Sequence, residues 1–359
     1  MKIFERYVAQ LALGIFGAVA LGMVALFVII DFGDWVRLYI GKPVTDVIAL
    51  YWYRSHLVFV QLGPAALVLA CGLTITVIRR RGEWTALRAL GASPVALLRP
   101  VLIVAVTAAV AMLAFEEFVV GKSGERADRI MVERFDRWGD FMVVYSPRRW
   151  FKAGDALVNV RGDFDASRLQ DVRVFQLGAK HELVAWTEAE SLTWVSKGVW
   201  RADNARVMRF DGAIVKDAVT GSLEIPLALA SEVTQLAVGR PEWMPLSVLL
   251  RQVELMRALE LPTEATRFAI HRRCADLVAT VVAALMASLL GLRARLKPSV
   301  PRALLEGAGL CGGLFVTGMM SRSLAINARL PPFAAAWLVP LVLFVVAAVM
   351  FRRTEATQR

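Results

Sequence analysis

Two stretches without a charged residue, Leu11–Ile30 and Leu57–Ile78, constrain this chain more than any other feature of its sequence. An α-helix rises 1.5 Å per residue, so about 20 apolar residues cross a hydrocarbon core of about 30 Å. Four further apolar runs are also predicted to span, although Glu306 interrupts one of them. They are Val101–Phe115, which Leu97, Leu98 and Arg99 extend, Leu277–Leu292, Ala303–Ser321 and Phe333–Phe351. The sequence therefore predicts an α-helical membrane protein with six spans, three on each side of a long polar insert.

The amino-acid composition agrees with a location in the lipid bilayer and excludes several classes of soluble protein. Of the 359 residues, 57% are hydrophobic and 20% charged, which is too apolar for a soluble domain of this size. The net charge is +11, but the basic residues lie beside the apolar runs and form no basic face, so no nucleic-acid partner is predicted. The three cysteines and three histidines have no metal-site or redox spacing, so no metal site is predicted.

The distribution of Lys and Arg predicts the orientation of the spans. With the N-terminus inside, the cytoplasmic segments hold 14 of these residues and the short opposite loops hold five. Both termini are therefore expected in the cytoplasm and the insert outside, which in a bacterium is the periplasm. A signal peptide is the alternative for the N-terminus, because Lys2 and Arg6 precede an apolar run. That run is long for a signal peptide, which favours an uncleaved span.

The insert has the pattern of an antiparallel β domain. From about Phe141 to Asp211, short alternating stretches are separated by glycines, which predicts a β-sandwich or jelly roll. Helices are expected on both sides of it, over Glu125–Trp138 and Leu246–Leu259. The domain boundaries predicted are 1–120 for three spans, 121–265 for the insert with its helices, and 266–359 for three more spans. Since the insert has no nucleophile motif, no hydrolase activity is predicted.

A short helix is predicted between the second and third spans, at about residues 82–91. Glu83 stands in its first turn, where a negative charge is favoured, and Gly91 and Pro94 mark its end. Two interpretations are open. The apolar side of the helix, with Trp84, Leu87 and Leu90, could rest on the membrane surface, or the helix could dock in a groove of an ATPase and couple it to the spans.

The residues of this helix resemble those of a known class of permease. Residues 83–93 read Glu-x-x-x-Leu-Arg-Ala-x-Gly-Ala-Ser, which is similar to the coupling segment of ATP-binding cassette (ABC) permeases that export lipids and lipoproteins. The arrangement of three spans, an insert and three spans resembles the LptF/LptG permease family (YjgP/YjgQ type). Supporting stretches are Phe4–Tyr7, Trp150–Gly154, Ala283–Arg295 and Leu330–Leu338, the last of which is more similar to LptG than to LptF.

The resemblance implies a function and a set of partners. It implies a permease in the inner membrane of a Gram-negative bacterium that extracts lipopolysaccharide together with a sister permease. An LptB-like ATPase dimer would supply the energy, and LptC-like and LptA-like proteins would form the periplasmic bridge. The chain has no P-loop, since Gly121-Lys122-Ser123 lacks the upstream glycine. The chain is therefore expected to be no enzyme and to bind no cofactor, with ATP and Mg held by the partner.

The resemblance also implies three groups of site residues. Glu83 is implied as the coupling carboxylate, with Trp84, Leu87 and Arg88 beside it. Six cations are expected near the periplasmic rim, where each could be an interfacial anchor and the set together could meet lipid phosphates: Arg37, Lys42, Arg54, Arg272, Arg273 and Arg322. Water is a poor route for acyl chains, which cost about 0.8 kcal/mol per CH₂ to expose. The resemblance implies instead an apolar cavity between two permeases that opens sideways between span 1 of one subunit and span 5 of the other. The glycines expected at this lateral gate are Gly17, Gly22, Gly312 and Gly313.

Two other functions remain open on the sequence. One is a permease that releases lipoproteins or exports a peptide, and the other is a membrane scaffold that holds periplasmic partners without transport. A scaffold has no need of the Glu83 helix. A lipoprotein exporter has no need of the cationic rim or of a gate in the fifth span.

Overall fold

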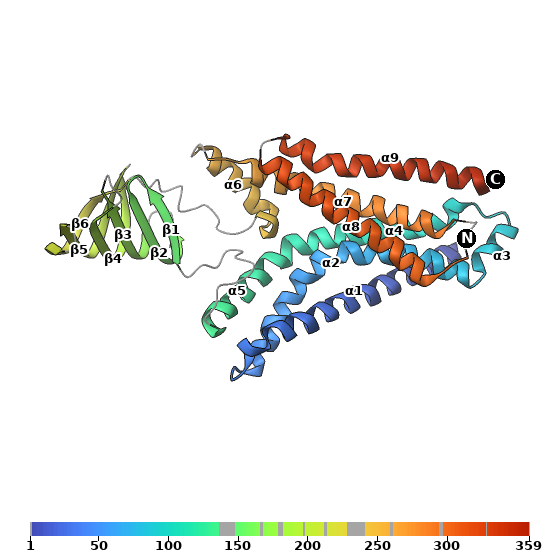
Figure 1. Ribbon diagram of the computed structural model, residues 1–359, viewed down its shortest axis with the longest axis horizontal. Coiled ribbons are helices and arrows are strands. Elements are labelled where there is room, and N and C mark those ends of the chain that lie inside the picture. Colours follow the sequence, from blue (N-terminus) through green and yellow to red (C-terminus); the bar gives the residue numbers. More distant parts are fainter. Residues whose placement is uncertain are drawn as a thin grey trace. The chain divides into compact units, whose positions relative to one another are not determined.

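A computed structural model describes residues 2–135, 148–165, 168–178, 182–196, 198–211, 214–227, 241–258, 261–293, 297–327 and 329–358 (Figure 1). Contacts between residues divide the chain into two compact units. One is helical and is built from both ends of the chain. The other contains the six strands of the insert together with residues 251–262.

The helical unit contains six helices that are long and apolar enough to span a membrane, as the sequence predicted. Most run side by side, and the short helix α3 lies at the same end of the unit as both termini (Figure 1). We call this end the α3 end. The helices of this unit are α1 (Lys2–Tyr39), α2 (Val44–Arg80), α3 (Glu83–Ala89), α4 (Pro94–Phe115), α5 (Gly121–Phe135), α7 (Glu264–Gly291), α8 (Val300–Ile326) and α9 (Pro332–Gln358). Helix α6 (Leu246–Ala258) begins in this unit, and from Arg251 onward it belongs to the other unit.

Helices α1 and α2 are longer than the apolar runs that predicted them. Beyond Ile30 helix α1 continues for nine residues to Tyr39, where Gly41 in the left-handed conformation (φ +78°) reverses the chain into α2. Polar groups pair across the two helices in this extension. The phenol of Tyr51 donates a hydrogen bond to Asp31 Oδ2 (2.8 Å), and Arg54 forms a 3.0 Å ion pair with the same oxygen. Interhelical pairing thus lets both helices continue past their apolar runs.

The centre of the helical unit is the close contact between α2 and α7. A Cβ atom added at Gly72 would lie 3.3 Å from Cβ of Ala287, and one added at Gly291 would lie 3.1 Å from Ile75. Arg79 Nη1 donates a 2.6 Å hydrogen bond to the carbonyl oxygen of Gly291, which fixes the end of α7. Small residues on facing helices therefore permit this approach, as is usual in membrane bundles.

Helix α4 continues into α5 through one π-helical turn, η1 (Glu116–Val120). Helix α5 packs on α2, and its buried face includes Ala127, Met131 and Phe135. The expected helix over Glu125–Trp138 is confirmed as far as Phe135, and its last residues lie outside the described ranges. The predicted helix over Leu246–Leu259 is also confirmed, as α6, up to Ala258. A 3₁₀ turn, η3 (Pro241–Trp243), precedes it.

The insert contains one six-stranded antiparallel sheet whose strands follow one another in sequence order. The antiparallel β domain is confirmed, and the order is that of a meander, without the crossover connections of a jelly roll among the described strands. The expected strand at Phe141–Tyr145 lies outside the described residues. The strands are β1 (Arg148–Ala153), β2 (Ala156–Asp165), β3 (Arg168–Leu177), β4 (Leu183–Ser196), β5 (Val199–Asp211) and β6 (Ile214–Pro226).

Alternation of side chains gives this sheet one buried face. Val158 pairs with Val174, and Val174 pairs with Thr187 on the next strand, and all three side chains are buried. Register shifts interrupt every strand pair after the first, and such bulges increase the local twist of a sheet. Trp200 is fully buried, so one large aromatic residue contributes much of the hydrophobic core on this face.

Candidate functional site: a short helix, a charged cavity and two open helix faces

Helix α3 is a single short helix with a defined start and end. Gly82 precedes it with φ +78°, and its carbonyl accepts the first helical hydrogen bond from the amide of Ala86 (3.1 Å). At the other end Gly91 has φ +82°, and the amide of Ala92 donates to the carbonyl of Leu87 (3.1 Å). A left-handed glycine at the C-terminus is the common helix stop. The helix predicted at residues 82–91 is therefore present.

Trp84 fixes α3 to the bundle. Its side chain is 5% exposed and belongs to the main buried cluster together with Val8 and Leu97. Leu87 packs partly against the same cluster. Leu90, in contrast, is 85% exposed at the end of the helix. The expected apolar side is thus divided: Trp84 is an internal anchor, and Leu90 is the exposed apolar residue.

Glu83 and Arg88 are the charged residues that α3 presents outside the core. The carboxylate of Glu83 accepts a 3.0 Å hydrogen bond from the phenol of Tyr7 in α1, and Arg81 lies 3.8 Å from the same oxygen. Arg81 also donates to the phenol of Tyr7 (2.9 Å). These contacts orient the carboxylate while leaving about a third of the Glu83 side chain exposed (31%). Arg88, one turn further, is exposed.

A cavity with a volume of about 410 Å³ lies among α2, α4, α7 and α8, with Glu242 and Trp243 at its edge. Three of the six predicted rim cations line it: Arg272, Arg273 and Arg322. Three carboxylates line it as well: Glu116, Glu242 and Asp276. The structure thus brings half of the predicted cations together, and it places an equal number of acidic groups beside them.

Each cation of this cavity has an acidic partner. Arg272 pairs with Asp276 one turn along α7 (3.0 Å), and Arg322 of α8 pairs with Glu242. Arg273 is 8% exposed and lies between Glu116 (3.3 Å) and Glu117 (3.2 Å) of the π-helical turn. An anion that entered the cavity would therefore have to displace a carboxylate from Arg272 or Arg322, both of which are partly exposed.

Glu117 and Arg273 also hold the start of α6. The carboxylate of Glu117 accepts a 2.6 Å hydrogen bond from the backbone amide of Leu246, at the N-terminal end of that helix. Arg273 donates to the backbone carbonyl of Met244. Because a helix N-terminus carries free amide groups and a partial positive charge, a carboxylate there is favourable. The π-helical turn, α7 and the first residues of α6 are thus joined in one network.

The other three rim cations lie on α1, on α2 and in the turn between them, and none of them lines this cavity. Arg37 is exposed near the end of α1, and Lys42 is exposed but donates to the carbonyl oxygen of Arg134 (2.8 Å). Arg54 is 5% exposed and paired with Asp31, so its charge is directed into an interhelical contact. The structure therefore divides the predicted rim into two groups, and it gives Arg54 a partner within the chain.

The four glycines predicted at a lateral gate lie on open helix faces. A Cβ added at Gly17 or Gly22 of α1, or at Gly312 or Gly313 of α8, would meet no atom within 4 Å. In the most apolar stretch of each span, 6% of the residues are buried in α1 and 11% in α8, compared with 61% in α2. These two helices are the least covered of the six, so their faces remain available to lipid or to another chain.

A comparison with protein families shows which family the chain belongs to. The model of the family described as the lipopolysaccharide export system permease LptF/LptG matches residues 6–353. The chain belongs to this family. No individual curated protein matches it. Membership of the LptF/LptG family makes the chain a transport permease and a multi-pass membrane protein, in agreement with its six spans.

Several residues that contact these candidate site residues were not predicted from the sequence. Asp31, Glu116, Glu117 and Glu242 neutralise predicted cations, and Tyr7 orients Glu83. One signal was available: acidic residues at the end of an apolar run are costly unless they find a partner. Asp31 and the Glu116-Glu117 pair both stand at such ends. No group of His, Cys, Asp and Glu residues that could hold a metal ion occurs in the described ranges.

Proposed function

We propose that the chain is one of two permeases of an ABC transporter that extracts lipopolysaccharide from the inner membrane and passes it to a periplasmic bridge. The observation that carries this proposal is the family match over residues 6–353, which covers the helical unit and the insert together. Both termini and α3 would lie in the cytoplasm of a Gram-negative bacterium, and the insert in the periplasm.

The geometry of α3 supports a coupling role. A lever must be rigid on its inner side and chemically distinctive on its outer side. Trp84 supplies the first, because it is buried in the bundle core. The second is supplied by the part-exposed Glu83, Arg88 and the exposed Leu90. An LptB-like ATPase dimer, which would hold ATP and Mg, would contact these residues and move α3 together with the spans.

The open faces of α1 and α8 support a lateral gate. Because these faces are uncovered in the single chain, a sister permease could pack against them, with α1 of one subunit facing α8 of the other. A gate of this kind lets acyl chains pass sideways from the bilayer, so they avoid water. The glycines on the two faces permit close approach of helices when the gate is closed. Arg272 and Arg322 would meet lipid phosphates, and LptC-like and LptA-like proteins would receive the lipid at the sheet.

The test is ATP-dependent release of lipopolysaccharide from proteoliposomes that contain this chain, its sister permease and the ATPase. The wild type is expected to release lipid only with ATP. Glu83→Ala is expected to reduce release at least about tenfold, because loss of one partner of an interfacial ion pair costs about 2–5 kcal/mol. Glu125→Ala is the matched control, since Glu125 also forms a part-exposed ion pair, with Arg129 (3.1 Å).

A second variant separates coupling from local structure. Tyr7→Phe removes the 3.0 Å hydrogen bond to Glu83 but keeps the carboxylate. If Glu83 acts on the ATPase, Tyr7→Phe retains most of the release that Glu83→Ala loses. If both variants lose release equally, the carboxylate only orients α3. If no lipid moves in the wild type and Glu83→Ala changes nothing, the chain is a scaffold.

A further inference from the structure

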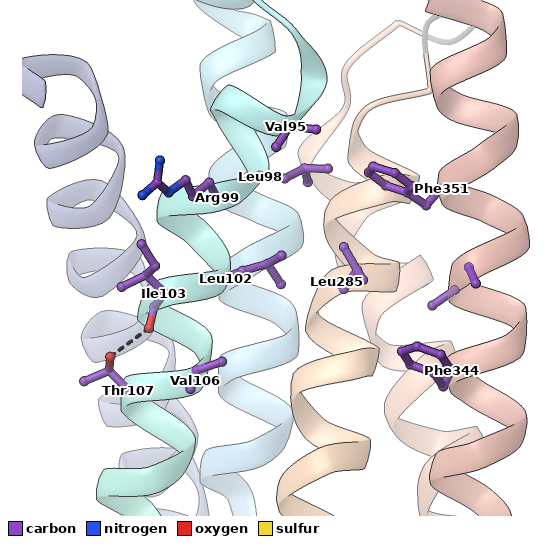
Figure 2. A pocket seen from close by; sticks show the side chains of 12 residues that line it. Val95, Leu98, Arg99, Leu102, Ile103, Val106, Thr107, Leu285, Phe344 and Phe351 are labelled. Atoms are coloured by element: carbon purple, nitrogen blue, oxygen red, sulfur yellow. Dashed lines mark hydrogen bonds between the residues drawn. The ribbon is translucent and has the colours of Figure 1, made fainter. Parts of the chain in front are cut away.

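A second hollow in the helical unit lies on helices that the proposed gate does not use. It is a groove with a volume of about 670 Å³ formed by α4, α7 and α9 (Figure 2). The side chains from α4 and α9 stand on either side of Leu285 from α7 (Figure 2). Its lining residues include Val95, Leu98, Arg99, Leu102, Ile103, Val106, Thr107, Leu285, Phe344, Ala347, Ala348 and Phe351.

The groove is apolar apart from one charge. Thr107 is the other polar residue in the lining, and its hydroxyl donates a 2.8 Å hydrogen bond to the carbonyl of Ile103 within α4 (Figure 2). That hydroxyl is therefore satisfied by its own helix. The guanidinium of Arg99 is exposed, and it carries five donors whose fork geometry matches the oxygens of a phosphate. The groove thus offers a hydrocarbon surface, and the guanidinium of Arg99 lies at its edge, on the side of α4 turned away from Leu285 and α9 (Figure 2).

The shape of the groove is fixed by the core beneath it. Leu98 is 2% exposed and Ala347 is 1% exposed, so both are held by packing in the bundle. The small side chains of Ala347 and Ala348 lie between the rings of Phe344 and Phe351 along α9. The hollow follows from this pattern, since two alanines leave space that two phenylalanines enclose.

The length of the groove matches one leaflet of a bilayer. Its lining on α4 runs from Val95 to Thr107, and the twelve steps between these residues rise about 18 Å at 1.5 Å each. Half of a hydrocarbon core of about 30 Å is about 15 Å. Val95 is the second residue of α4, which begins at Pro94 next to α3. The groove therefore starts at the α3 end of the span and stops near the middle of the membrane.

These dimensions select the occupant. A spanning helix of a partner protein would need a complementary face along the whole span, and this groove covers only one half. An acyl chain of a phospholipid has the required length, position and apolar character. An anionic headgroup is favoured over a zwitterionic one, because the cation of Arg99 stands at the edge of the groove near its α3 end (Figure 2), and no acidic residue is among the other lining side chains.

We infer that this groove is a binding site for one acyl chain of an anionic phospholipid in the leaflet at the α3 end, with Arg99 at the lipid phosphate. The groove is separate from the proposed gate between α1 and α8, and it shares no lining residue with the charged cavity that holds Arg272 and Arg322. A resident lipid would fill the hollow between α4 and α9 and join the two helices through hydrocarbon contacts. The inference therefore stands or falls independently of the proposed function.

The experiment uses the full chain in nanodiscs of phosphatidylethanolamine with a small fraction of phosphatidylglycerol that carries a photoreactive group on one acyl chain. After irradiation, mass spectrometry is expected to locate the label on peptides containing residues 95–107 and 344–351. An equally labelled phosphatidylethanolamine serves as the zwitterionic probe. Labelling by phosphatidylglycerol is expected to exceed it about fivefold, the effect of one cation at an anionic surface.

Two variants and two controls make the test specific. Ala348→Phe fills the groove from an exposed position and is expected to abolish labelling by both probes. Arg99→Gln is expected to remove the preference for phosphatidylglycerol while leaving labelling by phosphatidylethanolamine. Val345→Phe and Arg352→Gln, on the same helix but outside the groove, are expected to behave as the wild type. Val345 is 55% exposed, so an added ring is accommodated there.

Three outcomes would overturn the inference. The first is equal labelling of these peptides in Ala348→Phe and the wild type. The second is a wild type that does not distinguish the two probes. The third is labelling spread evenly over all six spans, which would mark the lipid as bulk bilayer. A thermal midpoint within a few degrees of the wild type shows that each variant is folded.

Discussion

Two pairs of helices in this chain carry glycines in similar apolar sequences and use them in opposite ways. In α2 and α7, Gly72 and Gly291 stand at a closed contact, where an added Cβ would lie within 3.3 Å of a neighbouring side chain. In α1 and α8, Gly17 and Gly312 face open space, with no atom within 4 Å of an added Cβ. The first pair builds the bundle, and the second leaves surface for the membrane or another subunit. Glycine in a span therefore marks possible approach, and burial decides whether the approach occurs within the chain.

The largest expected effect concerns the closed side of the bundle. Glu116 and Glu117 are mostly buried, and Arg273→Ala removes the cation that both of them pair with. The loss of one partner of a buried ion pair lowers the free energy of unfolding by about 3–5 kcal/mol. Arg272→Ala is the matched control, because its pair with Asp276 is partly exposed and worth about 1 kcal/mol or less. Thermal unfolding in detergent measures both. Equal midpoints for the two variants would contradict the network described here.

The next effect tests the contact of α2 with α7 directly. Gly72→Leu forces a side chain against Ala287, and overpacking of this kind costs about 1–3 kcal/mol. Gly17→Leu makes the same substitution on α1, where space is open, and the thermal midpoint of the isolated chain is expected to stay near that of the wild type. If both variants unfold at the same temperature, the proposed difference between closed and open faces is wrong.

The helices could be predicted from the sequence, but most contacts between them could not. Six spans and the α3 helix follow from local features: uncharged runs, an acidic first turn and a terminal glycine. The partner of Arg273 cannot be found this way, because Glu116 is more than 150 residues away in the chain and only packing joins them. The same holds for Trp84, whose exposure depends on α1 and α4, and for the extension of α1 past Ile30, which depends on Asp31 meeting Arg54.

A substitution on the open face of α8 is expected to affect assembly with the sister permease and to leave folding of the chain unchanged. Gly312→Leu on α8 is expected to leave the thermal midpoint of the isolated chain unchanged, since surface substitutions usually shift stability by about 0.5 kcal/mol or less. Recovery of the sister permease by co-purification is expected to fall several-fold, because a leucine prevents close approach of helices. Leu305→Val, at an exposed position of the same helix (74%), is the control. Unchanged recovery with Gly312→Leu would place the interface elsewhere.

The smallest expected effect lies at the start of α8. Arg302 and Glu306 form an ion pair one turn apart (3.0 Å), and Arg302 is 48% exposed. Pairs of this kind in helices contribute about 0.3–0.5 kcal/mol. A double-mutant cycle with Arg302→Gln and Glu306→Gln, followed by thermal unfolding, measures the coupling. A value near zero to 0.5 kcal/mol agrees with an exposed face, and 0.15 M salt should reduce it further by screening. A coupling several times larger would mean that this turn of α8 is shielded from water, and α8 would then belong with α2 and α7 on the closed side of the comparison.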